Sequence, residues 1–180
     1  MKFNSTLIKG KLIKRYKRFF TDIEANNKVI TAHCPNTGSM MGLLNKGNDV
    51  WVSENNDPKR KLKFTLEIIK ANNLMFGVNT HRANRIVEHG LKNKLLKEFI
   101  KIKNIKREFK YSKDTRFDFL CDNNIIIEVK NVTLVRSKNI AEFPDAITDR
   151  GTKHLENLIN SIKKGYKPYV IFLTQIQGIN

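Results

Sequence analysis

Residues 116–130 read RFDFLCDNNIIIEVK, and this segment is the most informative part of the chain. Two runs rich in β-branched and aromatic residues flank the turn-forming triplet 122–124, a pattern that predicts an antiparallel hairpin. A hairpin centred on Asn123 gathers apolar residues on one face, whereas a shift by one residue would exchange the two faces. The predicted apolar pairs are Phe117 with Val129, Phe119 with Ile127, and Cys121 with Ile125.

The other face of this predicted hairpin carries two carboxylates. In the same register Asp118 lies opposite Glu128, with Cβ atoms about 5 Å apart. Like charges repel at that distance, and a bound cation would reverse the sign of the interaction; carboxylate oxygens suit Mg²⁺ or Mn²⁺. Lys130 points from the same face as Glu128, where its ammonium could orient a water or stabilise charge on a phosphate. The alternative is that Asp118 pairs with Arg116 or Lys130 on an exposed sheet face.

The composition indicates a polyanionic partner. The 180 residues include 34 Lys and Arg against 17 Asp and Glu, a formal net charge of +17, and the hydrophobic fraction of 40% suffices for a packed core. Such a balance favours nucleic acid. Because Lys, Asn and Ile share AT-rich codons, base composition is an alternative source of the excess charge. Positive charge gathers at residues 9–18 and 92–113, as a phosphate-binding surface or as an ordinary solvated one.

Several classes of protein are excluded. No apolar run approaches the ~18 residues of a membrane span, so no membrane partner is expected. The N-terminus lacks the apolar segment of a secretory signal, which predicts a cytoplasmic protein. Two cysteines, Cys34 and Cys121, cannot form a disulfide framework, and the scattered histidines argue against a structural zinc site.

The pattern along the chain changes near residue 80. Before it, five β-rich runs separated by turn signals suit a small barrel or sandwich, with an OB-like barrel as one candidate. After it, the order helix, three strands, helix, strand indicates an α/β arrangement. The predicted strands of the first part are residues 7–13, 19–23, 28–32, 50–53 and 62–69. The predicted elements of the second part are helices 82–99 and 146–164 and strands 105–111, 116–121, 125–134 and 169–173.

The second predicted helix has two distinct faces. One face carries an apolar stripe at helical spacing and is predicted to pack in the core. The other face is polar and is either solvated or directed at a substrate. The apolar stripe is Leu155, Leu158, Ile159 and Ile162, and the polar face is Arg150, Lys153, His154 and Asn157.

Asp118 followed by Glu128-Val129-Lys130 resembles the PD-(D/E)xK nuclease signature. Seven segments in order, between about residues 15 and 173, further resemble the sugar fermentation stimulation protein A (SfsA) family. These segments are RYKRF (15–19), HCPNTGSM (33–40), KRK (59–61), VNT (78–80), RFDF (116–119), EVKNVTL (128–134) and FPDAITDRGTKHL (143–155).

The resemblance implies a mixed α/β protein of two domains. Residues 1–80 are expected to form an OB-like nucleic-acid-binding barrel, and residues 81–180 a PD-(D/E)xK nuclease-like domain with an αβββαβ core. Since members of the family continue for some tens of residues beyond the strand at 169–173, this core is expected to be shortened at its C-terminus. DNA is the implied partner, with single or double strands left open, and a homodimer is one alternative for the oligomeric state.

The resemblance also assigns roles to individual residues. Asp118 and Glu128 become metal ligands for Mg²⁺ or Mn²⁺, and Lys130 becomes the catalytic lysine. Glu108 joins the metal ligands if the preceding turn is centred on Lys113; otherwise it is a surface glutamate. The predicted DNA contacts are Arg15, Lys17, Arg18, Arg60, Arg150, Lys153 and His154.

The leading hypothesis is therefore a DNA-binding protein that hydrolyses phosphodiester bonds with a divalent metal, as a deoxyribonuclease. The alternative is a noncatalytic DNA-binding regulator of sugar-utilisation genes that keeps the nuclease fold.

Overall fold

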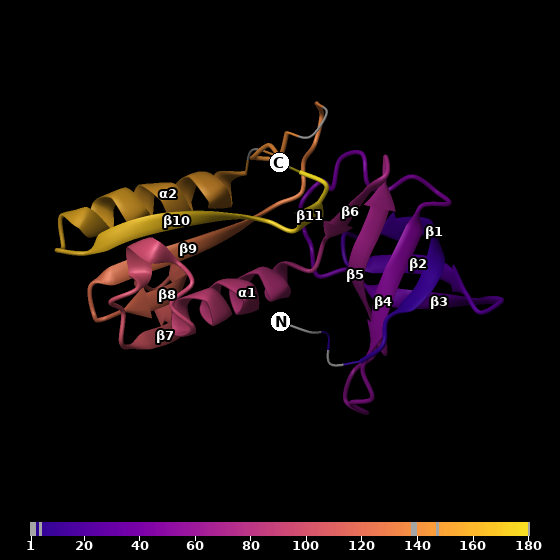
Figure 1. Cartoon of the computed structure of the whole chain (residues 1–180), viewed down its shortest axis with the longest axis horizontal. Coiled ribbons are helices and arrows are strands. Elements are labelled where there is room, and N and C mark those ends of the chain that lie inside the picture. The colour runs from indigo at the N-terminus through magenta and orange to yellow at the C-terminus, as the bar shows by residue number, and fades with distance from the viewer. Residues whose placement is uncertain (1–2, 4, 138–139, 147, 180) are drawn as a thin grey trace. The chain divides into compact units, whose positions relative to one another are not determined.

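The computed structural model describes residues 3, 5–137, 140–146 and 148–179 (Figure 1). These residues form two compact units, which the chain enters more than once. The first unit contains the residues up to His81 together with segments 131–146 and 174–180, and the second contains residues 82–130 and 147–173. No helix among these residues is long and apolar enough to cross a membrane.

The first unit is built on a closed five-stranded barrel. Strand β1 pairs with β2 and β4, β2 pairs with β3, and β4 pairs with β5. A parallel pairing of β3 with β5 closes the ring. This connectivity confirms the OB-like barrel. The strands are β1 (Ile8–Tyr16), β2 (Phe20–Ala25), β3 (Lys28–His33), β4 (Asp49–Glu54) and β5 (Phe64–Ala71).

Asparagine pairs make the tight turns of this unit. Asn26-Asn27 joins β2 to β3, and Asn72-Asn73 joins β5 to β6 (Leu74–Gly77), with positive φ at all four residues. A two-residue hairpin turn with this backbone matches the twist of the flanking strands, and asparagine tolerates it better than most residues do. These turns fix the registers of β2 with β3 and of β5 with β6.

Two additions to the barrel were not predicted from the sequence. Strand β6 extends the sheet beyond β5, and the short strand β11 (Ile176–Gln177), from the far end of the chain, pairs with β6. Asp145 also lies in this unit, where its carboxylate accepts hydrogen bonds from Ser39 Oγ at 3.4 Å and the Met40 amide at 3.3 Å. Segments after residue 130 thus return to the first unit.

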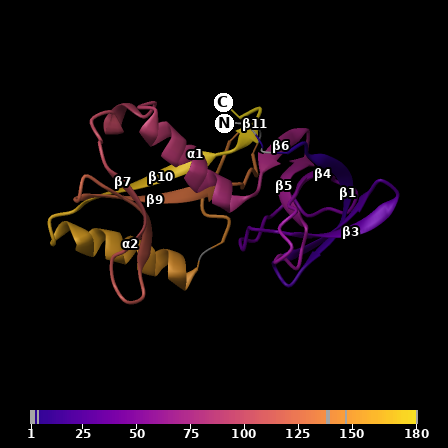
Figure 2. The ribbon, with the colours of Figure 1, turned by 90° about the horizontal axis from the view of Figure 1, so that it is seen from below.

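The second unit has the predicted αβββαβ order. A four-stranded sheet runs β10-β9-β8-β7, and Figures 1 and 2 show helices α1 and α2 on its opposite faces. Its elements are α1 (Thr80–Lys92), a 3₁₀ turn (Lys97–Phe99), β7 (Ile105–Lys110), β8 (Arg116–Cys121), β9 (Ile125–Val132), α2 (Asp149–Ile162) and β10 (Lys167–Thr174).

The predicted hairpin register is confirmed for the pairs Phe119–Ile127 and Cys121–Ile125. The predicted pairs Phe117–Val129 and Asp118–Glu128 are not among the pairs of β8 with β9, and the alternation of faces is broken at Asp118. Phe119 pairs with Ile127 and packs in the cluster that α1 covers. Phe117, two residues earlier, should share that face in a regular strand. It packs instead with Leu158 of α2. The prediction of one continuous apolar face was therefore wrong at Phe117.

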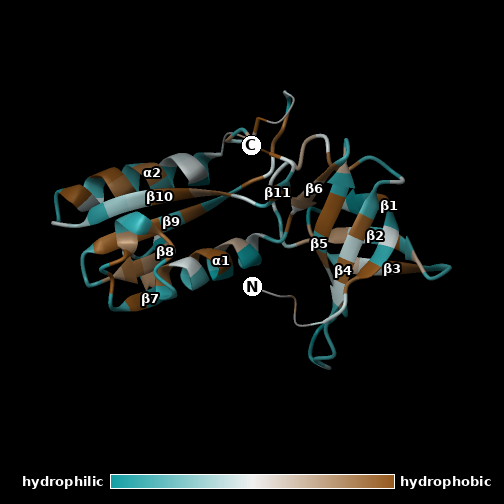
Figure 3. Cartoon of the chain, in the orientation of Figure 1, coloured by the Kyte–Doolittle hydropathy of each residue, from teal (hydrophilic) through white to brown (hydrophobic). Residues whose placement is uncertain are grey.

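The apolar stripe predicted for α2 is only partly buried. Leu158 is 4% exposed, whereas Leu155, Ile159 and Ile162 are 46%, 63% and 57% exposed. Figure 3 shows this apolar colouring along α2. All four residues lie on α2 as the spacing predicted, but the residues that the structure describes bury only Leu158 among them.

Leu158→Ala should lower the free energy of unfolding by about 3 kcal/mol, because it removes a buried side chain and leaves a cavity. The neighbouring control Ile159→Ala should cost less than about 1 kcal/mol, since that side chain is already mostly in water. Urea denaturation of both variants measures the difference. Equal costs would show that α2 packs through another face.

Candidate functional site

Asp118 lies where strands β8 and β9 separate. The antiparallel pairing of β8 with β9 runs from Cys121 and Ile125 to Phe119 and Ile127. Beyond that pair, the backbone amide of Val129 donates to Asp118 Oδ2 at 2.7 Å. Asn84 of α1 donates its Nδ2 proton to Oδ1 at 2.6 Å. The carboxylate is thus fixed by a strand and by a helix, and no pattern in the sequence indicated Asn84 as a partner.

Glu128 is held by partners from β9 and α2. Its side chain is buried, and its Oε1 accepts hydrogen bonds from Lys130 Nζ at 2.7 Å and from His154 Nδ1 at 2.9 Å. Because an ionised carboxylate only accepts, the proton in the histidine contact belongs to Nδ1. His154 is itself buried on α2. The structure therefore brings Glu128, Lys130 and His154 together.

The two carboxylates influence each other. Burial raises the pKa of Asp118 from its ordinary value of 3.8 to about 6, and the negative charge of Glu128 adds to that rise. The hydrogen bonds from Val129 and Asn84 and the ammonium of Lys130 oppose it. A carboxyl group in this position gains from protonation or from a nearby cation.

Glu108 does not join this pair. The turn is centred on Lys113, the condition under which Glu108 was expected to join the metal ligands, because Arg107 pairs with Phe119 and Phe109 with Phe117. However, Glu108 itself has a φ of 53°, its side chain is 56% exposed, and its carboxylate lies 3.7 Å from Arg116. In the part of the chain that the structure describes, no group of three or more His, Cys, Asp and Glu side chains could hold a metal ion.

Three of the predicted DNA contacts gather in the second unit. Arg150, Lys153 and His154 lie in the first turns of α2 and line a cleft of about 470 Å³. His154 reaches Glu128 from this cleft. His154 therefore joins the cleft to Glu128.

The predicted contacts of the barrel are dispersed, and Arg15 has a structural role. Its guanidinium donates to the backbone carbonyls of Asn36 at 2.7 Å, Gly38 at 3.0 Å and Arg18 at 3.0 Å. These partners hold the loop after β3, a role that the sequence did not reveal. Lys17 and Arg18 are exposed in the turn after β1.

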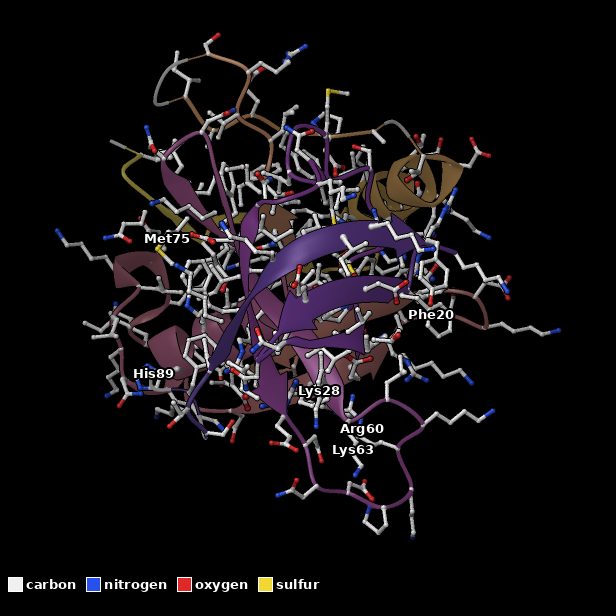
Figure 4. All side chains as sticks on the ribbon, turned by 90° about the vertical axis from the view of Figure 1, so that its right-hand side faces the viewer. Phe20, Lys28, Arg60, Lys63, Met75 and His89 are labelled. Carbon is white, nitrogen blue, oxygen red and sulfur yellow. The ribbon has the colours of Figure 1, made fainter. Side chains whose placement is uncertain are left out.

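Arg60 lies in the loop between β4 and β5, with Lys63 nearby (Figure 4). It is exposed, and its charge lowers the pKa of His33, whose own burial is the larger cause. Arg60 therefore acts electrostatically on His33, at the end of β3.

Comparisons with known proteins agree with both units. Residues 13–78 match the family model "SfsA N-terminal OB domain", and residues 81–180 match "Sugar fermentation stimulation protein RE domain". A solved structure of SfsA from Pyrococcus furiosus in complex with Ca²⁺ superposes with a TM-score of 0.89 at 21% identity, covering 99% of this chain and 77% of that one. At this identity the likeness establishes the fold.

Two curated relatives are similar in sequence as well. The sugar fermentation stimulation protein homolog of Pelagibacter ubique is 60% identical over 183 residues, which cover 100% of this chain and 79% of the relative. The homolog of Maricaulis maris is 42% identical, covering 97% of this chain and 77% of the relative. With both domain models matched in order, the chain belongs to the sugar fermentation stimulation protein family.

Proposed function

We propose that this protein binds DNA and hydrolyses its phosphodiester bonds at Asp118, Glu128 and Lys130. One observation carries the proposal: a buried Glu128 is ion-paired with Lys130 at 2.7 Å, beside an Asp118 whose pKa is raised by burial and by Glu128. Two crowded carboxylates and an adjacent ammonium are costly in a fold unless they serve a ligand, and perturbed groups of this kind cluster at functional sites.

The donor set suits a divalent cation. Asp118 and Glu128 would hold Mg²⁺ or Mn²⁺, because each ionised carboxylate has more acceptor positions than its contacts use. The hydrogen bonds that described residues give to Glu128 all reach Oε1, which leaves Oε2 for a cation. A cation there would polarise a phosphoryl oxygen as a Lewis acid. The relative from P. furiosus was solved with Ca²⁺, a cation of the same oxygen-binding class.

The chain's own residues would do the remaining work. The ammonium of Lys130 is positioned by Glu128 to hold a water molecule or to stabilise negative charge on a phosphate. His154 contacts the same Glu128 oxygen, Oε1, and helps to hold the carboxylate in place. Basic residues of the barrel turn and of α2 would bind the DNA backbone, in keeping with the net charge of +17.

DNA affinity should fall steeply with salt, because neutralising Z phosphates of duplex DNA gives a log–log slope of about −0.9Z. Labelled single- and double-stranded DNA, incubated with Mn²⁺ or with EDTA, reports binding and cleavage together. Cleavage that requires Mn²⁺ supports the proposal. An affinity unchanged between low and moderate salt contradicts DNA binding and would assign the lysines to codon bias.

A noncatalytic DNA-binding regulator is the second candidate. Two observations favour it: both oxygens of Asp118 already accept hydrogen bonds, and the described residues supply no third metal-ligating side chain to the pair. Salt-dependent DNA binding with no cleavage in Mn²⁺ would select this candidate.

A further inference from the structure

The cleft beside Glu128 has two basic walls. Its volume of about 470 Å³ falls in the range of roughly 300–1,000 Å³ found for sites that enclose a ligand. The first wall is the segment that joins β7 to β8, and the second is the start of α2. The basic side chains are Lys110, Lys113 and Arg116 on the first wall, and Arg150, Lys153 and His154 on the second.

The lining is cationic with little internal compensation. Five Lys and Arg side chains share the cleft with two carboxylates, Asp114 and Asp149. Within the described ranges, the one carboxylate paired with any of these five cations is Glu108, at 3.7 Å from Arg116. Cations gathered in a concave site repel one another and raise the local concentration of anions. The arrangement therefore favours an anionic ligand.

Hydrogen bonds hold the two walls in place. Asn157 of α2 donates its Nδ2 proton to Thr115 Oγ1 at 2.9 Å, which joins the walls directly. The Thr115 carbonyl accepts from the amides of Tyr111 at 3.0 Å and Ser112 at 3.1 Å. Thr148 caps α2 by accepting from the Gly151 amide at 3.1 Å, so the positive end of the helix dipole lies at this wall. Little ordering is needed before a ligand binds.

One side chain connects the cleft with the carboxylates. His154 lines the cleft, is 8% exposed, and donates from Nδ1 to Glu128 Oε1 at 2.9 Å. Its ring stands edge-on to Phe117, with centroids 6.1 Å apart. A ligand in the cleft would therefore lie beside a ring that also contacts Glu128.

We infer that the cleft binds successive phosphate groups of one nucleic-acid strand, beside the phosphate at Asp118 and Glu128. The inference rests on the proposed function and adds the β7–β8 segment to it. The five cationic side chains on the two walls carry more positive charge than one phosphate group neutralises, whereas a nucleic-acid strand brings several phosphate groups. No Phe, Tyr or Trp is among the lining residues, so the cleft offers no stacking platform for a base. Its contacts are with the backbone and carry no sequence preference.

The test compares two double variants in a fluorescence-anisotropy titration of a labelled single-stranded oligonucleotide in EDTA. Lys113→Gln/Lys153→Gln should weaken binding about tenfold and reduce the log–log salt slope by about 1 to 2, since each phosphate-bound lysine contributes about one. The control, Lys163→Gln/Lys167→Gln, removes two exposed lysines of the same unit outside the cleft and should change affinity less than about twofold. Lys113→Arg/Lys153→Arg should restore binding.

The outcomes separate the two hypotheses. Absence of oligonucleotide binding by the unmodified protein would contradict the proposed function itself. Normal binding by the unmodified protein, with equal losses in both Gln variants, would overturn the cleft assignment alone. A deoxynucleoside monophosphate is titrated in parallel. If it binds the unmodified protein and loses affinity in the cleft variant while the oligonucleotide does not, the cleft holds a free nucleotide and the strand assignment is wrong.

Discussion

Lys130→Met is expected to lower the rate of DNA cleavage at saturating DNA by at least about 100-fold, with Mn²⁺ binding retained. Methionine keeps the length of the side chain but removes the ammonium that lies 2.7 Å from Glu128 Oε1. Losing one such preorganised group typically lowers the catalytic rate constant by a factor of about 10²–10³. A cleavage assay gives the rate, and calorimetric titration gives the Mn²⁺ affinity.

A matched control is Lys106→Met, which removes an exposed lysine of β7 in the same unit. It should cleave DNA at the unmodified rate. If Lys130→Met also cleaves normally, the catalytic assignment fails. If it loses Mn²⁺ together with cleavage, Lys130 acts by holding Glu128 and has no direct part in the reaction.

Asp118→Asn should raise the free energy of unfolding by about 3 kcal/mol at pH 8 in EDTA, and by progressively less toward pH 4. The folded pKa of about 6 exceeds the ordinary 3.8, so between these values the folded state binds more protons than the unfolded state. The free energy of unfolding of the unmodified protein therefore falls as pH rises from about 4 to 6, and it stays at this lower level above pH 6. An asparagine cannot ionise, so the Asp118→Asn protein does not lose this stability.

The amide also suits the local contacts. Its oxygen can accept from the Val129 amide, and its NH₂ group can face Asn84, whose own amide can rotate to present oxygen. The same change should abolish stabilisation by Mn²⁺, because one charged ligand is lost. Urea denaturation at several pH values, with and without Mn²⁺, measures both effects.

Asp114→Asn serves as the control for this experiment. Asp114 is an exposed carboxylate of the same unit, and its replacement should change stability by less than about 0.5 kcal/mol at every pH. An Asp118→Asn protein that is less stable than the unmodified one at pH 8 would show that the negative charge of Asp118 supports the fold.

The hairpin that carries the site could be predicted because two independent signals agree there. The turn triplet fixes its centre, and the alternation of apolar residues fixes its register; the observed pairs Phe119–Ile127 and Cys121–Ile125 follow from both. An alternation of apolar and polar residues with a period of two is enough to predict such a register. The preceding turn lacks such agreement, and the sequence left its centre at Lys113 as one of two alternatives; the observed pairs select that centre.

The details of the site depend on contacts that the sequence pattern does not contain. The positive φ at Glu108 sends its carboxylate to Arg116 and away from Asp118. Arg15 binds carbonyls more than 20 residues away along the chain, a distance at which no periodicity applies. On α2, spacing shows which residues share a face, but it does not show whether another element packs there, as the exposure of Ile159 illustrates.

The pairing of β11 with β6 has a consequence for biosynthesis. A ribosome releases β6 long before Ile176 and Gln177 are translated, and the entire second unit is made in between. The barrel strands β1 to β5 can close as the nascent chain emerges, because their partners are near in sequence. The edge at Met75 and Phe76 stays open until Ile176 and Gln177 have left the exit tunnel. Assembly of the first unit therefore begins cotranslationally and ends only after synthesis has passed through the second.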